Sequence, residues 1–130
     1  VFGCSMCWRL VLQHVVALST TEAEYIAIGE VIKEAVWLKG ICAEILARKD
    51  VNTGVYCDSQ SAIHLSKHQV FHERSKHIDV RLHYIREIVQ SGEVSLTKIA
   101  SSKNPADMLT KPLPSVKFVL CKDLTGVTTL

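Results

Sequence analysis

Three acidic residues occupy positions at which proteins often build metal sites. Glu24 falls in the first turns of an expected helix, Asp58 directly follows an expected strand, and Asp107 falls in the first turn of a later helix. In open α/β sheets, ligands bind beyond the carboxyl ends of the strands. Carboxylates gathered there repel one another, and Mg²⁺, which prefers oxygen ligands, would relieve that repulsion. Two such ions about 3.5–4 Å apart can hold a phosphodiester for in-line displacement, one activating water and one stabilising the leaving oxygen.

Each of these acids also has a purely structural explanation. Asp58 can cap the helix that follows it, and Asp107 can interact favourably with a helix dipole. Glu24 would lie on the surface if the helical phase differed by one position. Because helix caps are far commoner than active sites, the three acids taken alone favour the structural explanation.

The first third of the chain predicts a strand followed by a long helix. Residues 1–19 are rich in strand-forming side chains and are expected to be extended. Ser19 and Glu22 have the spacing of a capping box, which predicts a helix start. The helical pattern continues to about Leu46, with Gly40 as a candidate break.

One face of this helix is expected to pack on a sheet. Ile28, Val31 and Ala35 form its apolar stripe, and Glu24 lies one turn before them on the same face. A carboxylate that faces a sheet is costly unless something compensates its charge. This placement makes Glu24 a candidate metal ligand.

The rest of the chain alternates strands and helices. Residues 55–57 are a short strand, and Asp58 or Ser59 is expected to cap the next helix. Residues 66–76 are polar and read as a loop, after which a second long helix ends at Gly92. Residues 94–99 form a last strand, and a helix capped by Asn104 runs to Pro112. This order predicts an α/β layered sheet.

Four blocks of the sequence resemble one known family. They are residues 15–25 (VVALSTTEAEY), 56–62 (YCDSQSA), 71–81 (FHERSKHIDVR) and 104–113 (NPADMLTKPL), and residues 34–38 (EAVWL) agree as well. In this order they are similar to the ribonuclease H domain at the C-terminal end of copia-type retrotransposon Pol polyproteins. The blocks span almost the whole chain, which makes the resemblance far more specific than a single short motif.

The resemblance implies a fold, an activity and a set of site residues. The fold would be the three-layer ribonuclease H-like α/β fold, with a mixed sheet flanked by helices. The activity would be hydrolysis of the RNA strand of RNA–DNA hybrids with two Mg²⁺ ions, beside the reverse transcriptase of the polyprotein. Glu24, Asp58 and Asp107 would be three of four metal-binding, catalytic carboxylates. The nucleic acid would be bound through Ser59, Gln60, His72, Arg74, Lys76, His77 and Arg81.

The chain departs from this family at its N-terminus. The family's first Asp lies on a strand before the region at which this chain begins, and no acid precedes Glu22 here. We therefore expect an incomplete metal cluster, a sheet without its first, central strand, and no activity in this truncated form. Residues 1–113 would form the incomplete domain, and residues 114–130 the C-terminal tail of the polyprotein.

Two other classes of function compete with this interpretation. The first is a non-catalytic nucleic-acid-binding or structural remnant on the same fold, which the missing Asp favours. The second is a zinc-binding module, because Cys4 and Cys7 have ligand spacing and His64, His68 and His72 recur at helical intervals. A single Cys pair without a second pair nearby is weak support for zinc.

Composition narrows the setting without identifying a partner. The chain has 130 residues, is 48% hydrophobic, and carries a net charge of only +2, so nucleic-acid binding would depend on local clusters of charge. Its five scattered cysteines predict free thiols in a reducing compartment. The apolar N-terminal stretch is interrupted by polar residues, so we expect neither a secretion signal nor a membrane span. The expected location is intracellular, in cytoplasmic virus-like particles or the nucleus.

Overall fold

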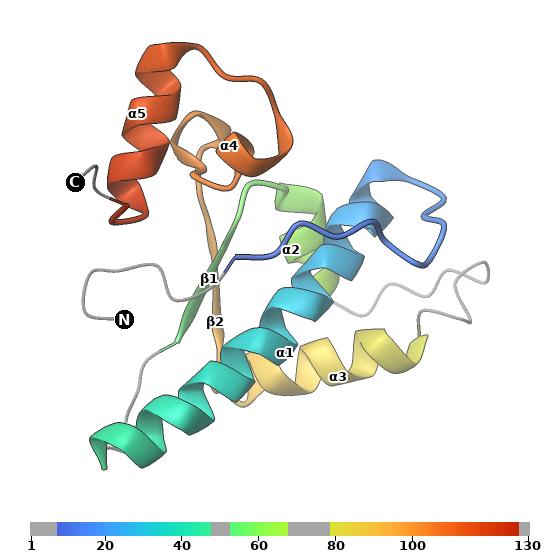
Figure 1. Cartoon of the computed structure of the whole chain (residues 1–130). Coiled ribbons are helices and arrows are strands. Elements are labelled where there is room, and N and C mark those ends of the chain that lie inside the picture. The colour runs from blue at the N-terminus through green and yellow to red at the C-terminus, as the bar shows by residue number, and fades with distance from the viewer. Residues whose placement is uncertain (1–7, 48–52, 68–78, 128–130) are drawn as a thin grey trace. The chain divides into compact units, whose positions relative to one another are not determined.

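The computed structural model describes residues 8–47, 53–67 and 79–127, without the side chains of residues 79–82 (Figure 1). The chain divides into two compact units. Residues 16–98 form the first, which we call the sheet unit, and residues 1–15 with 99–130 form the second, which we call the terminal unit.

The sheet unit begins with the long helix α1, which spans Thr20–Leu46. The Ser19 side chain accepts a hydrogen bond from the Glu22 backbone N–H at 3.1 Å, and Glu22 Oε2 accepts one from the Leu18 N–H at 2.6 Å. The first bond satisfies one of the N–H groups that a helix N-terminus leaves without partners, and the second holds the residue before the cap. The predicted start and end are confirmed, and α1 continues through Gly40 without a break.

The buried face of α1 differs from the predicted face by one residue. Its core side chains are Tyr25, Ile28, Ile32 and Ala35, whereas Val31 is 49% exposed. The spacing of three, four and three residues follows the helical repeat, so Ile32 occupies the stripe that we had assigned to Val31. The prediction that Glu24 faces inward was also wrong, because Glu24 is exposed and lies beside the stripe.

Two short parallel strands support the helices of the sheet unit. Strand β1 spans Gly54–Cys57 and β2 spans Ser95–Lys98, with Val55 paired to Leu96. Paired residues point to the same face, and Val55, Cys57 and Leu96 all belong to the hydrophobic core. The opposite face carries Tyr56, which is 68% exposed. The helices of this unit therefore pack on one face of the strand pair.

Helices α2, Gln60–Lys67, and α3, Asp79–Gln90, connect the two strands. Such a crossover through helices is the usual connection between parallel strands. Ile63 of α2 and Ile85 of α3 are buried against α1, and a Cβ on Gly29 of α1 would meet Ile85 Cδ1 at 3.1 Å. Gly29, which has no side chain, therefore allows α1 and α3 to approach each other closely. Gly92, with φ +74°, follows the end of α3 as predicted.

The predicted N-terminal strand is absent from the part of residues 1–19 that the structure describes. Residues 8–19 have no strand assignment, and Trp8, Leu12 and Val16 are exposed. A strand requires a hydrogen-bonded neighbour as well as strand-forming side chains. Residues 8–127, where described, contain only the pair β1 and β2, and neither pairs with this segment.

The terminal unit contains three short helical elements. These are the 3₁₀ turn η1, Ser101–Lys103, the single-turn helix α4, Asp107–Thr110, and α5, Ser115–Leu124. Asn104 Oδ1 accepts a hydrogen bond from the Ala106 N–H at 3.2 Å, so Asn104 organises the turn before α4 rather than capping the helix itself. Helix α4 ends before Pro112, as predicted. Helix α5 was not predicted, because most of its apolar side chains are exposed and form no stripe.

The described residues confirm the α/β class and a parallel strand pair. The three-layer ribonuclease H-like fold with a mixed sheet stays a prediction, as do the domain boundaries at residues 113 and 114. Within the described ranges, no helix is both long and apolar enough to cross a membrane.

Candidate functional site

Two of the three predicted acids lie together in the sheet unit. The carboxylates of Glu24 and Asp58 and the Cys57 thiol each have a ligand atom within 4.8 Å of the others. Glu24 comes from the second turn of α1, Cys57 ends β1, and Asp58 is the next residue. The cluster therefore lies at the carboxyl end of a parallel strand, where α/β proteins commonly bind ligands.

The local structure leaves the Asp58 carboxylate available for another role. Ser59 Oγ accepts the hydrogen bond of the Ala62 N–H at 3.3 Å, so Ser59 caps α2. The alternative in which Asp58 is the cap is therefore wrong. Lys98, at the end of β2, donates a hydrogen bond from Nζ to the backbone carbonyl of Asp58, which ties the two strand ends together.

The Cys57 thiol is buried in the core beside the two acids. Burial raises its pKa above the usual 9.0, a hydrogen bond from the Ser59 backbone opposes this, and the charges of Glu24 and Asp58 raise it further. The Lys98 ammonium opposes the increase. The thiol is therefore neutral near pH 7.

The donor set fits Mg²⁺ through its oxygens alone. Mg²⁺ is commonly bound through one or two carboxylates together with water and phosphate oxygens. Glu24 and Asp58 provide two such carboxylates, and a neutral thiol is a poor ligand for so hard an ion. The two acids can thus contribute to a magnesium site, and Cys57 would lie beside that site.

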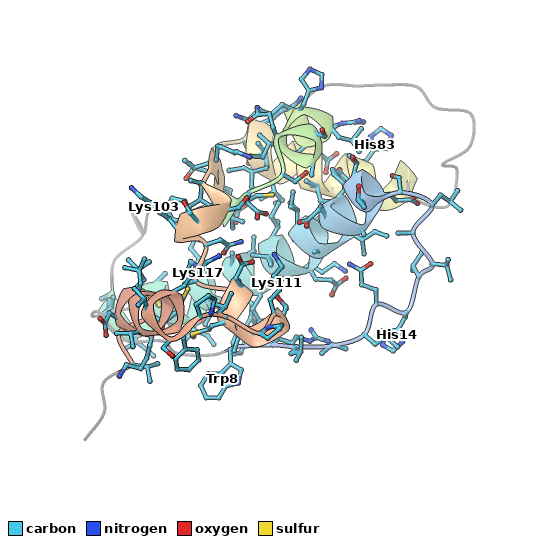
Figure 2. The ribbon with its side chains drawn as sticks, turned by 90° about the horizontal axis from the view of Figure 1, so that it is seen from above. Trp8, His14, His83, Lys103, Lys111 and Lys117 are labelled. Carbon is cyan, nitrogen blue, oxygen red and sulfur yellow. The ribbon has the colours of Figure 1, made fainter. Side chains whose placement is uncertain are left out.

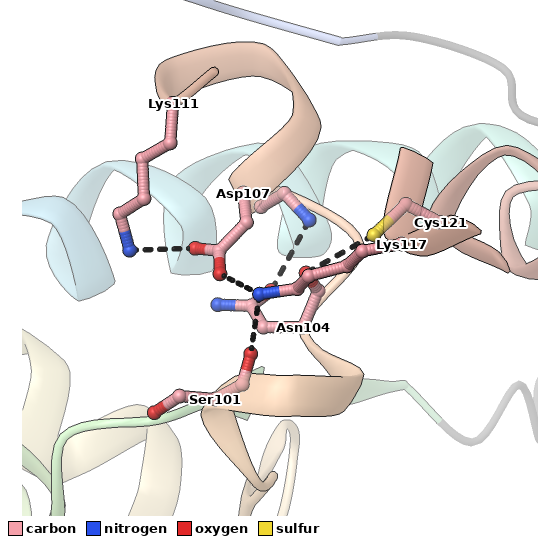
Figure 3. A network of polar contacts seen from close by, with 7 residues as sticks. Ser101, Asn104, Asp107, Lys111, Lys117 and Cys121 are labelled. Atoms are coloured by element: carbon pink, nitrogen blue, oxygen red, sulfur yellow. Dashed lines mark hydrogen bonds and ion pairs between the residues drawn. The ribbon is translucent and has the colours of Figure 1, made fainter. Parts of the chain in front are cut away.

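The third predicted acid, Asp107, lies in the terminal unit and has a different environment (Figure 3). Its side chain is buried, Oδ1 accepts a hydrogen bond from Lys111 Nζ at 2.8 Å, and Oδ2 accepts one from Lys117 Nζ at 2.9 Å. The bond from Lys111 and then that from Lys117 lower the pKa of Asp107 below its usual 3.8, against the opposing effect of burial. Asp107 is therefore ionised and paired with two cations.

Lys117 connects three consecutive elements of the terminal unit, since it contacts Asp107 of α4 and Ser101 of η1 from its place on α5. Lys117, from α5, also approaches the Ser101 carbonyl of η1 at 3.4 Å, and Cys121 Sγ lies 3.7 Å from the Asn104 carbonyl (Figure 3). Figure 2 labels three lysines of this unit: Lys103 on η1, Lys111 directly after α4, and Lys117 on α5. Asp107 is the anion at the centre of the network.

Sequence reasoning missed three residues that shape these sites: Cys57, Lys111 and Lys117. Lys111 follows Asp107 by four residues, a spacing that places oppositely charged side chains side by side on a helix, so it could have been found. Cys57 precedes Asp58, but alternation along a strand sends the two side chains to opposite faces, which argued against their meeting. Lys117 comes from the unpredicted helix α5 and gave no local signal.

Most of the predicted nucleic-acid-binding residues lie outside the described residues. This holds for His72, Arg74, Lys76 and His77, and the side chain of Arg81 in α3 is likewise not described. Ser59 and Gln60 are described at the start of α2, where Ser59 is the cap. The histidines His68 and His72 and the pair Cys4 and Cys7 of the zinc alternative also lie outside. Binding by any of these residues stays a prediction.

Comparison with known proteins identifies relatives along nearly the whole chain. It is 54% identical over 96% of its length to a retrovirus-related Pol polyprotein from transposon TNT 1-94 of Nicotiana tabacum. It is 36% identical over 93% and 85% of its length to the Pol polyproteins from transposons RE1 and RE2 of Arabidopsis thaliana. The chain spans only 9%, 8% and 8% of the lengths of these three relatives.

Neither a family model nor a solved structure matches the chain. The descent of the chain is established by its relatives alone. The chain is a homologue, along nearly its whole length, of a short segment of the Pol polyproteins of copia-type plant retrotransposons.

Proposed function

We propose that this segment is the ribonuclease H part of a retrotransposon Pol polyprotein, and that in the polyprotein it hydrolyses the RNA strand of RNA–DNA hybrids with Mg²⁺. Glu24, Asp58 and Asp107 would be its metal-binding carboxylates, joined by a fourth from another segment of the polyprotein. The reverse transcriptase of the same polyprotein would supply the hybrid. The reaction would occur where the element is copied, in cytoplasmic particles or the nucleus.

One observation carries this proposal. Glu24 and Asp58 are far apart in the sequence, yet their carboxylates lie within 4.8 Å of each other at the carboxyl end of β1. Among the described residues, no lysine or arginine forms an ion pair with either of them. Two like charges held this close favour a cation that comes from outside the protein.

The residues of this cluster would have distinct roles in hydrolysis. Glu24 and Asp58 would hold Mg²⁺, which when bound activates water and stabilises the leaving oxygen. Lys98 fixes the backbone at Asp58, and Ser59 fixes the start of α2 directly after it. Both contacts would keep the carboxylate of Asp58 in one position, which is what a preorganised catalytic site requires.

A non-catalytic role is the second candidate, and Asp107 favours it. Both carboxylate oxygens of Asp107 accept hydrogen bonds from lysines, so each would have to be released before Asp107 could bind a metal. A segment that binds hybrid without cutting it would keep this network intact.

A cleavage assay separates the two candidates. The substrate is an RNA–DNA hybrid labelled on the RNA strand, with Mg²⁺, and the proteins are this chain and a longer Pol segment that includes the region before residue 1. We expect cleavage by the longer segment, and its loss in E24Q and D58N variants of that segment. E30Q is the matched control, because Glu30 is likewise an exposed acid on α1 but is paired with Lys33.

The outcomes are distinct when hybrid binding is measured in parallel. Cleavage that survives both E24Q and D58N would refute the assignment of the site. Binding without cleavage in a folded long segment would favour the non-catalytic role.

A further inference from the structure

The Cys57 thiol makes the acid cluster chemically different from a site built of oxygens alone. Cys57 is 6% exposed, and its Sγ lies within 4.8 Å of the carboxylate oxygens of Glu24 and Asp58. The three side chains come from two elements, α1 and the end of β1, and their donor atoms converge. Thiolate sulfur and carboxylate oxygen are both ligand types that bind zinc in proteins.

We propose that Glu24, Cys57 and Asp58 form a site for a thiophilic divalent cation, Zn²⁺ or Cd²⁺, in which Cys57 is the ligand that selects these ions over Mg²⁺. Thiolate ligands favour zinc and softer ions, whereas carboxylates and water suit Mg²⁺. The metal–sulfur bond forms as the thiol releases its proton to the solvent, and no electron is transferred. Water would complete the tetrahedral coordination, as in zinc sites with three protein ligands.

The geometry requires only a small contraction of the cluster. Zn–S bonds of about 2.3 Å and Zn–O bonds of about 2.0–2.2 Å place neighbouring tetrahedral ligands about 3.5 Å apart. The present separations of up to 4.8 Å would therefore close by roughly 1 Å. Cys57 is held by its pairing with Lys98 in the sheet, whereas Glu24 is exposed and has a long side chain. Glu24 would close onto a sulfur whose position is already fixed.

This site is distinct from the zinc module considered from the sequence. That alternative used Cys4, Cys7 and histidines, none of which belongs to the present cluster. The inference is also independent of hybrid hydrolysis, because cation binding can be measured without nucleic acid. If the proposed function holds as well, Zn²⁺ or Cd²⁺ would displace Mg²⁺ from Glu24 and Asp58 and inhibit cleavage.

Cadmium titration of the untagged chain tests the proposal. Every protein in this titration also carries the substitutions C4S and C7S, so that these two N-terminal thiols do not bind Cd²⁺. Binding is followed by calorimetry and by the ultraviolet absorption of the cadmium–thiolate bond. We expect one Cd²⁺ per chain and, in C57S, loss of the absorption with affinity weakened at least about tenfold, since even an outer-shell partner is worth about 10–100-fold.

Two further variants keep the test decisive. C121S is the matched control, because Cys121 is also a buried thiol but lies in the terminal unit, and it should leave Cd²⁺ binding unchanged. E24Q alters an exposed side chain and leaves the core intact, so it tests the cluster even if C57S is poorly folded. We expect E24Q to weaken Cd²⁺ binding at least about tenfold while the absorption at saturation persists.

The proposal is overturned if C57S binds Cd²⁺ as tightly as its background, or if E24Q leaves the affinity unchanged. The first result would place the ion elsewhere, and the second would reduce the site to a single thiol. Failure of the cleavage assay alone would overturn the proposed function and leave this inference standing. A Mg²⁺ affinity that falls in C57S together with that for Cd²⁺ would contradict the selective role of Cys57.

Discussion

The two acidic regions of this chain solve the same electrostatic problem in opposite ways. In the sheet unit, Glu24 and Asp58 lie close together and form no ion pair with a described lysine or arginine. In the terminal unit, Asp107 is buried and accepts hydrogen bonds from Lys111 and Lys117. The first region favours a cation from outside, whereas the second supplies its cations from within the chain.

This difference shows that the function of a carboxylate depends on what neutralises it. A pair of like charges at a surface is destabilising until a cation binds, so it is suited to ligand binding. A buried carboxylate with two lysines is already compensated, and it holds together the elements that provide the lysines. From the sequence the three acids looked equivalent, whereas the structure places two of them close together and pairs the third with two lysines.

Replacing Asp107 should have the largest effect on stability. D107N removes the anion and leaves two ammonium groups close to each other, so we expect a loss of about 1.5–3 kcal/mol in the free energy of opening α5, the range for hydrogen bonds to charged groups. Hydrogen exchange of the α5 amides measures this directly. An exchange rate in D107N equal to that of the wild type would show that the network has no structural role.

The same residue predicts a dependence of stability on pH. The pKa of Asp107 is lowered in the folded state, so its contribution is fully present above the usual value of 3.8 and is lost as pH falls through the lower folded value. We expect the protection of α5 to decrease progressively below about pH 4 in the wild type. D107N should lose that acid dependence, and a wild-type profile that stays flat in this range would contradict the lowered pKa.

Much of the fold could be predicted because local chemistry determines it. Ser19 and Glu22 marked the start of α1, Gly92 marked the end of α3, and strand-forming residues before Asp58 marked β1. In each case the physical cause lies within a few residues of the element. Local rules alone favoured a structural role for each acid, so the proximity of Glu24 and Asp58 was expected only from the family resemblance.

The failures share a different cause, because they depended on tertiary contacts. Val31 and Ile32 are equally apolar, and only packing against β1, α2 and α3 decides which of them is buried. The strand expected within residues 1–19 had the right side chains, but none of the described strands pairs with it. Lys117 could not be connected to Asp107 because α5 had no apolar stripe to reveal it.

Neutralising Glu24 or Asp58 should change the stability of the sheet unit less than D107N changes that of α5. The change should also have the opposite sign. Two carboxylate oxygens within 4.8 Å of each other repel by about 1 kcal/mol in water. E24Q and D58N should therefore each leave the sheet unit as stable as the wild type, or slightly more stable, in the absence of divalent ions. Thermal unfolding with a chelator measures this.

Added Mg²⁺ sharpens the contrast between the two regions. It should raise the unfolding temperature of the wild type and have less effect on E24Q, because only a ligand that binds the folded state stabilises it. D107N should weaken this response less than E24Q does, because both carboxylate oxygens of Asp107 already accept hydrogen bonds from lysines. Equal responses of the wild type and E24Q to Mg²⁺ would show that the acid pair does not bind this ion.

The smallest expected effect on stability comes from replacing one of the two lysines that contact Asp107, and it should differ between them. The Lys117 side chain is 29% exposed and also approaches the Ser101 carbonyl, whereas the Lys111 side chain is 58% exposed. Either substitution leaves Asp107 one ammonium, so K111M should cost only about 0.3–0.5 kcal/mol, as for an exposed helical ion pair. K117M should cost roughly 1 kcal/mol, because its interactions are better shielded from water. Protection of the α5 amides in the two variants measures the difference, and a larger loss in K111M would mean that solvent exposure does not control the strength of these pairs.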